Sequence, residues 1–246
     1  MLETLAIVLG AALLAVACVG LKVRFWPSSD SEEREDVAEY ISMMVGVFYA
    51  LILGVSLVSV WEVRSAAQDA VQTEANAAHQ ISVLADDLAP RQTVGVGPGI
   101  DAYASYVQDV EWPEMAAGDP IGDRGWELLS VVRKADAQLP DNATTTQEMA
   151  TQEVLSQLGT LGDARSDREE VPDRTMPGPL WLGLIIGGVL SVAFMFVFEV
   201  RRSFTHGVMV MGLVGLIAFL IVLITQLDSP FSGPFAVDAT PFSRYF

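Results

Sequence analysis

Residues that commonly carry enzyme chemistry are scarce in this chain of 246 residues. It has two histidines, His79 and His206, and one cysteine, Cys18, which lies inside an apolar stretch. The H-E-x-x-H pattern of zinc peptidases, the G-x-S-x-G pattern of serine hydrolases and the glycine-rich phosphate loop are all missing. A nucleophile with its base, or a set of metal ligands, cannot be built from these residues. The sequence therefore predicts a protein that is not an enzyme and that holds no metal ion or other cofactor.

Paired carboxylates are the other residues whose spacing allows acid–base chemistry. Asp86-Asp87 and Glu169-Glu170 form two such pairs. Both lie in a segment rich in acidic residues, where pairs of this kind usually belong to the solvated face of a helix. We therefore expect these carboxylates to keep the surface soluble rather than to carry out catalysis.

Four long apolar stretches determine where the functional residues of the chain can lie. They are residues 5–21, 41–60, 179–200 and 207–227, and the only charged side chain among them, Glu199, lies at a border. Each approaches or exceeds the roughly 20 residues that an α-helix needs to cross a bilayer. Because a single segment in lipid can satisfy its backbone hydrogen bonds only as a helix, we predict four transmembrane helices in an all-α protein. The lack of central carboxylates argues against a proton pump or a cation exchanger.

The apolar stretches divide the chain into two hairpins around one soluble insert. The predicted domains are a first transmembrane hairpin at 1–61, an acidic helical soluble domain at 62–178, a second transmembrane hairpin at 179–227 and a C-terminal tail at 228–246. The chain has 31 acidic and 14 basic residues, and the insert alone has 21 and 8, which is −13 of the net charge of −17. Such a domain repels nucleic acid and anionic lipid headgroups, so nucleic acid is excluded as a partner.

The insert is predicted to be helical throughout. Residues 55–89 contain neither Gly nor Pro, and apolar residues recur there at spacings of three and four, so the second span should continue as one helix over 41–89. Residues 91–99 contain three glycines and a proline, which predicts a loop. Asp101 is expected to cap a helix that ends at Pro113.

The buried faces of the insert helices are predicted from the same spacing. The helix after Asp101 should bury Tyr103, Tyr106, Val107 and Val110; a third should bury Trp126, Leu129, Val132 and Ala135; and a fourth should bury Met149, Val154, Leu158 and Leu161. No run of alternating β-branched residues occurs, so no sheet is expected.

Small residues mark faces on which membrane helices can approach closely. Gly46, Ala50 and Gly54 are four residues apart in the second span, and Gly183 and Gly187 form a G-x-x-x-G pattern in the third. Two interpretations remain open for the second span: its small residues pack against other helices of the same chain, or they face an oligomer axis or a permeation path.

The second span also supplies groups that could line a pore. Phe48, Tyr49, Ser56 and Ser59 are aromatic or hydroxyl side chains within it. A pore needs no buried charge, because apolar constrictions gate by dewetting and hydroxyl groups can line the path. Together with the missing catalytic groups, this favours a passive channel or an interaction scaffold over an enzyme.

Several segments resemble one known family, the bestrophin-like bacterial membrane proteins of unestablished function. They are W-E-V-R-S-A-A-Q-D-A-V-Q-T-E-A-N from Trp61 to Asn76; Tyr106-Val107 followed by Glu111-Trp112-Pro113 and Met115; Leu161-Gly162-Asp163 with Arg165 and Arg168; and Asp228-Ser229-Pro230-Phe231-Ser232-Gly233 with Val237, Pro241 and Phe242. From its residue types, the segment that begins at Asp228 should form a structured turn, which Asp228 caps and in which Gly233 permits the bend.

The resemblance implies a function by analogy with the more distant bestrophins, which are pentameric anion channels. It implies a multi-pass protein of the bacterial cell (plasma) membrane that forms a homo-oligomer, conducts small anions and has its soluble domain in the cytosol. By the same analogy the second span lines the pore, with Phe48, Tyr49, Leu51 or Ile52 at a constriction. After the fourth span only Asp228 and Asp238 are acidic, so the chain departs from the acidic calcium site of the animal proteins.

Two hypotheses follow for the function. The first is a bestrophin-like oligomeric channel, and the alternative is a membrane-anchored scaffold whose acidic domain binds a basic protein partner. The basic residues are denser in the two short loops, which favours an external soluble domain. The bestrophin plan favours a cytosolic one, and we adopt that orientation as the expectation. The sequence does not identify the permeant ion, the gating signal or the number of subunits.

Overall fold

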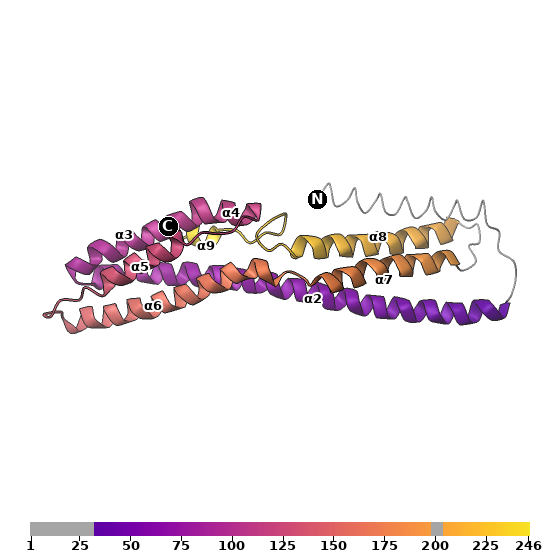
Figure 1. The fold of residues 1–246 in the computed structure, drawn as a ribbon, viewed down its shortest axis with the longest axis horizontal. Helices are drawn as coiled ribbons and strands as arrows, with labels where there is room; N and C mark the ends of the chain where they lie inside the picture. The colour runs from indigo at the N-terminus through magenta and orange to yellow at the C-terminus, as the bar shows by residue number, and fades with distance from the viewer. Residues whose placement is uncertain (1–31, 198–203) are drawn as a thin grey trace. The chain divides into compact units, whose positions relative to one another are not determined.

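A computed structural model describes residues 32–197 and 204–246, and within them the protein is entirely helical (Figure 1). The elements are α2 (Glu32–Leu84), the 3-10 turn η1 (Ala85–Asp87), α3 (Pro90–Tyr106), the π-turn η2 (Val107–Glu111), α4 (Trp112–Ala117), α5 (Arg124–Asp136), α6 (Thr145–Glu170), η3 (Val171–Arg174), α7 (Gly178–Val197), α8 (Phe204–Leu227) and α9 (Thr240–Ser243). The predicted all-α class is confirmed over this part of the chain. The first predicted span, residues 5–21 with Cys18, lies outside it.

Two of the described helices are long and apolar enough to cross a membrane by length and composition. They contain the stretches Tyr40–Asp87 and Gly207–Leu227. A third helix, α7, has a shorter apolar stretch, Gly178–Phe194. The arrangement of four spans with an inserted domain therefore stays a prediction.

The chain divides into two compact units. The first unit consists of residues up to Glu62 together with Met176–Asp228, and the second consists of Val63–Thr175 together with Ser229–Phe246. The helix α2 belongs to both units, since it continues without interruption through the boundary at Glu62. The absence of Gly and Pro from residues 55–89 predicted this continuity.

The core of the first unit lies between the first half of α2 and the helices α7 and α8. Tyr49, Leu53 and Val60 of α2 are buried there with Leu184 of α7 and Ile224 of α8. Residues 49, 53 and 60 follow each other at intervals of four and seven, so they share one face of α2. The opposite side of this half of α2 is apolar and exposed in the single chain.

The core of the second unit joins the second half of α2 to α3, α5, α6 and the C-terminal tail. Buried side chains from all of them form one cluster, which contains Val71, Ile100, Val132, Leu158 and Phe242 among others. The helix α6 begins at a capping box, in which Thr144 accepts a hydrogen bond from the Gln147 backbone and Gln147 returns one to the Thr144 backbone.

The predicted loop at residues 91–99 is wrong, because α3 begins at Pro90 and runs through it. The glycines serve close packing instead of a turn. A Cβ atom on Gly95 would lie 2.5 Å from the Ala135 side chain, and one on Gly99 would lie 2.8 Å from Val132. Glycine at these positions lets α3 and α5 approach each other, and Pro90 suits the first turn because its missing N–H has no helical partner there.

Other helix boundaries also differ from the sequence-based expectation. The α-helical part of α2 ends at Leu84, five residues before Ala89, and η1 follows it. Asp101 lies inside α3 rather than at its cap. Pro113 stands in the first turn of α4 instead of ending a helix, because the π-turn η2 carries the helical path onward from Val107.

Most of the predicted buried positions are confirmed, with three exceptions, and Tyr106 is only half-buried. Met149 is 67% exposed, and Val110 and Trp126 are each 38% exposed. Met149 stands in the first two turns of α6, where a helix has fewer neighbours. Val110 lies in η2, whose wider turn displaces the residues after Val107 from the face that an α-helix would give them.

Candidate functional site

The predicted pore-lining residues occupy two different faces of α2. Tyr49 and Ser56 are buried against the rest of the first unit. Phe48 and Ile52 are exposed, and at about 100° per residue Ser59 shares their face. In the single chain, therefore, Tyr49 and Ser56 contribute to packing, whereas Phe48, Ile52 and Ser59 lie on a surface that could contact water, lipid or another subunit.

Of the small residues predicted to let membrane helices approach closely, one makes such a contact in the structure. Gly187 of α7 faces Tyr49, because a Cβ atom added there would lie 2.5 Å from the tyrosine ring, and Gly188 is similarly close to the Tyr49 hydroxyl. Gly46, Gly54 and Gly183 have open space around the position of an added Cβ among the described residues, and Ala50 is exposed.

Asp228 joins the end of α8 to the start of α7. Its Oδ1 accepts a hydrogen bond from the Met176 backbone N–H at 2.8 Å, and its Oδ2 accepts one from the Trp181 indole at 3.3 Å. The expected role of Asp228, capping its own turn, is therefore replaced by a bond across the hairpin. A carboxylate beside the first turn of α7 also complements the positive end of the helix dipole. The turn that follows does form, and Gly233 has a φ of +82° there.

Inside the second unit, five polar side chains with no exposed surface contact one another, and they form the largest group of interacting ionisable residues in the described part of the chain. Glu74 comes from α2, Tyr103 from α3, Glu111 from the end of η2, and Arg165 and Arg168 from α6. Glu111, Arg165 and Arg168 belong to the motifs that resemble the family, and Tyr103 is a predicted buried position, but no contact among them was predicted. We call this set the buried ion-pair network.

The pairs in the buried ion-pair network are close and doubly bonded. Arg165 donates from both terminal nitrogens to Glu111, at 2.9 and 2.6 Å. Arg168 donates to both oxygens of Glu74, at 2.5 and 2.9 Å, and also to Glu111 at 2.8 Å. The Tyr103 hydroxyl donates to Glu74 and accepts from Arg165. Two-pronged guanidinium–carboxylate pairs of this kind are among the strongest charged hydrogen bonds.

The pKa values of the network are fixed by the balance between burial and pairing. Burial alone would raise the pKa of the Glu111 carboxyl, but the hydrogen bond from Arg165 and the charges of Arg168 and Arg165 hold it below its usual range. Burial would lower the pKa of Arg168, but Glu74 more than compensates. Burial and the Glu74 charge raise the pKa of Tyr103 well above its ordinary value. Glu111 and the two arginines therefore stay ionised near neutral pH, and the network suits a structural role better than proton transfer.

Neighbouring residues leave space for the arginine side chains of the buried ion-pair network and stack against them. A Cβ atom on Gly125 would collide with the Arg165 guanidinium, so glycine is required in the first turn of α5. Trp126 and Trp112 stack on the two arginines, with ring centres 5.3 Å from Arg165 Cζ and 5.8 Å from Arg168 Cζ. Trp112 also makes edge-to-face contacts with Phe231 and Phe242 from the tail.

The four segments that resemble the family thus have a shared structural basis. Glu74 belongs to the first, Glu111 and Trp112 to the second, Arg165 and Arg168 to the third, and Phe231 to the fourth. The sequence did point to the network, because charged residues within the motifs of a family often form ion pairs with one another. The pairing itself could not be read from it, because it joins residues up to 94 positions apart.

A second buried polar set lies at the far end of α3 and α5. The Gln92 amide donates to the Asp136 backbone carbonyl at 2.5 Å and to Thr151 at 2.9 Å, and its oxygen accepts from the Ala89 N–H. The Asp136 carboxylate is buried, and neither oxygen has a hydrogen-bond partner among the residues that the structure describes. Desolvation raises the pKa of Asp136 to about 6.

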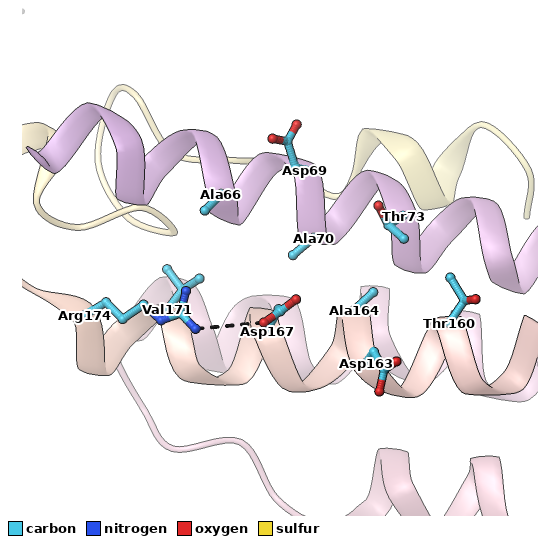
Figure 2. Close-up of a pocket in the computed structure, with 10 residues that line it drawn as sticks. All are labelled: Ala66, Asp69, Ala70, Thr73, Thr160, Asp163, Ala164, Asp167, Val171 and Arg174. Atoms are coloured by element: carbon cyan, nitrogen blue, oxygen red, sulfur yellow. Dashed lines mark ion pairs between the residues drawn. The ribbon is translucent and has the colours of Figure 1, made fainter. Parts of the chain in front are cut away.

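A groove of about 420 Å³ lies between α2 and α6 within the second unit (Figure 2). Its lining consists of Ala66, Asp69, Ala70, Thr73, Thr160, Asp163, Ala164, Asp167, Val171 and Arg174. Figure 2 shows Ala70 of α2 and Ala164 of α6 turned toward each other, so short side chains leave the space open. In the described part of the chain, no group of His, Cys, Asp or Glu side chains is arranged to hold a metal ion.

Comparison with known proteins places the chain in a family. The model of the bestrophin-like family, described as a bestrophin-like domain, matches residues 9–242. No curated protein and no solved structure matches the chain. Because the match covers nearly the whole sequence, the protein belongs to the bestrophin-like family, as the motifs predicted.

Proposed function

We propose that this protein is a homo-oligomeric membrane channel whose pore is lined by the Phe48, Ile52 and Ser59 face of α2 and which conducts small anions. The observation that carries the proposal is the stretch of α2 from Tyr40 to Trp61, which has no charged side chain. One of its faces is occupied by α7 and α8, while the face that carries Phe48 and Ile52 is exposed in the single chain. Membership of the bestrophin-like family supports both a channel-like protein and an oligomer.

Apolar residues on that face would act as a constriction rather than as a selectivity filter. Rings of Phe48 and Ile52 from several subunits would exclude water when they are close together and conduct when they separate. Ser59, about two turns beyond Ile52 along α2, would supply hydroxyl groups to the path. The negative charge of the second unit repels anions from any pore opening that it borders. Whether the permeant ion is an anion or a cation therefore has to be measured.

The test is conduction by the purified full-length protein in planar bilayers. We expect a current whose reversal potential in a potassium chloride gradient shows chloride selectivity. Phe48→Ala should change the open probability or the unitary conductance, and Val47→Ala, at the same depth but about 100° round the helix, should not. Cation selectivity would refute the anion assignment. Absence of current under varied pH, calcium and voltage would refute the channel.

The proposal places the protein in the bacterial plasma membrane with the second unit in the cytosol. Asp141, an exposed residue of the second unit, offers a test of orientation. In a Cys18→Ala background, Asp141→Cys should resist a membrane-impermeant maleimide in intact cells and react after lysis. Labelling in intact cells would reverse the orientation without affecting the pore assignment.

The alternative function is a membrane-anchored scaffold, which the acidic surface of the second unit favours. Acidic surfaces attract basic partners at rates that depend on salt. Affinity capture with the full-length protein in detergent, at low and at high salt, should recover a basic protein only at low salt. If capture recovers nothing basic while the bilayers show current, the channel is retained and the scaffold is rejected.

A further inference from the structure

We propose that the groove between α2 and α6 receives the C-terminal segment of a second copy of this chain, with Arg244 beside Asp163. This contact would be the head-to-tail interface of the oligomer, so the inference rests on the proposed function. Three features of the second unit support it: the unpaired acids of the groove, the unpaired Arg244, which is one of four such cations, and the positions of the groove and Arg244 around α2.

The groove is acidic and part of that charge is uncompensated. Three of its lining residues are aspartates and one is an arginine. Arg174 is bonded to Glu170 at 2.9 Å and lies 3.9 Å from Asp167, as Figure 2 shows for the second pair. Asp69 and Asp163 have no hydrogen bond or ion pair with any described residue. Alanines at the centre and aspartates at the sides suit a long cationic side chain, whose stem contacts apolar surface while its head meets carboxylates.

Most cations of the second unit already have partners. Arg165 and Arg168 are in the buried ion-pair network, Arg124 pairs with Glu127, Arg174 pairs with Glu170, and Arg64 bonds the Phe235 carbonyl. Among the described residues of this unit, four exposed cations have none: Arg91, Arg133, Lys134 and Arg244.

Of these four cations, Arg244 matches the groove in its position along α2. The hydroxyl of its neighbour, Tyr245, donates to Asn76, less than one turn beyond Thr73 at the end of the groove. Arg133 and Lys134 instead adjoin Ala135, which packs against Gly95, and Arg91 lies in the first turn of α3. If two copies lie side by side with their α2 helices at the same height, Arg244 of one copy is therefore closer to the groove of the next than the other three cations are.

The groove and the C-terminal segment lie on different flanks of α2. Ala66, Ala70 and Thr73 line the groove, while Asn76 and His79 contact Tyr245, whose ring stacks on His79 with centres 4.2 Å apart. At about 100° per residue these two sets are about 120° apart around α2, and the face of α2 that packs in the core lies outside the angle between them.

Two different mating surfaces on one subunit produce a heterologous contact, which closes into a ring when the rotation allows. A basic partner protein would be the competing occupant of the groove, and the experiment below separates it from a second copy.

The experiment is a charge exchange measured by native mass spectrometry of the full-length protein in detergent and in nanodiscs. Arg244→Asp and Asp163→Arg should each weaken self-association at least tenfold, since each places like charges at the contact. The double variant should restore it. Arg133→Asp is the matched control, and unfolding by circular dichroism should show that every variant is folded.

A second measurement places the two residues directly. In a Cys18→Ala background, Arg244→Cys together with Asp163→Cys should give a ladder of cross-linked copies with a short bis-maleimide, and Arg133→Cys with Asp163→Cys should not. The inference is overturned if neither charge reversal weakens the self-association of the parent, or if the double variant stays dissociated. Either result leaves the proposed oligomer standing. A monomeric parent would overturn both.

Discussion

Buried acidic side chains of the second unit are in two opposite electrostatic situations. Glu74 and Glu111 are each paired with arginines, whereas the Asp136 oxygens have no partner in the described part of the chain. Removing one member of a buried pair leaves its partner charge desolvated and uncompensated, which is strongly unfavourable. Removing the charge of Asp136 does the reverse, because it relieves a burial cost that no pairing offsets.

Glu74→Gln should lower the free energy of unfolding by about 3–5 kcal/mol, because Arg168 would lose its two-pronged partner. Asp69→Asn, on the same helix but exposed, should change it by less than about 0.5 kcal/mol. Urea unfolding followed by tryptophan fluorescence suits this comparison, since Trp112 and Trp126 stack on the arginines of the network. Equal stabilities for the two variants would show that the network does not hold the second unit together.

Asp136 should make stability depend on pH. Its pKa is raised from 3.8 to about 6 in the folded protein, so its contribution is most favourable below about pH 4 and is lost as the pH rises through about 6. Asp136→Asn should therefore raise the free energy of unfolding at pH 8 by about 1–3 kcal/mol and change it little at pH 4. A variant whose advantage is the same at both pH values would contradict the raised pKa.

At the scale of helices, the sequence predicted periodicity well and predicted the role of glycine poorly. The spacing of Leu129, Val132 and Ala135 located α5, and the uninterrupted residues 55–89 located the long helix α2. Gly95 and Gly99 were interpreted as a loop because a glycine that permits close packing looks the same, in one sequence, as a glycine that permits a turn. The partner helix decides between them, and it is known only from the fold.

Gly187 gives a test of helix packing in the first unit. Gly187→Ala should weaken the contact between α7 and Tyr49, because the added Cβ would lie 2.5 Å from the ring. Gly183→Ala is the control, since an added Cβ there meets no described atom within 4 Å. Thermal unfolding in detergent should show a lower midpoint for the first variant only. The packing assignment would be wrong if Gly183→Ala were the more damaging change.

The continuity of α2 across Glu62 can be tested by a proline at an exposed position. Ser65→Pro should remove a helical hydrogen bond and cost about 3 kcal/mol or more, whereas Ser65→Ala should be nearly neutral. If α2 transmits movement from the second unit to the pore, the proline variant should still insert and assemble but should conduct differently from the parent. A proline variant that matches the parent in both assembly and current would contradict transmission through α2.

At the scale of the whole molecule, the protein combines a network that fixes the second unit with a helix that the two units share. Membership of the bestrophin-like family was predictable from the motifs, but their structural basis was not, since it depends on contacts such as that between Arg168 and Glu74, 94 residues apart. The pore face was predicted only as a set of side chains on α2. The fold separates that set, because Tyr49 and Ser56 face α7 and α8 while Phe48 and Ile52 do not.

The central claim is that the Phe48 and Ile52 face of α2 lines a water-filled path. The most direct test is cysteine modification during current recording, with Ile52→Cys and Val47→Cys each made in a Cys18→Ala background. A charged methanethiosulfonate reagent should progressively change the current through Ile52→Cys and leave Val47→Cys unaffected. Modification at Val47→Cys alone, or no effect at either position in a conducting protein, would contradict the account.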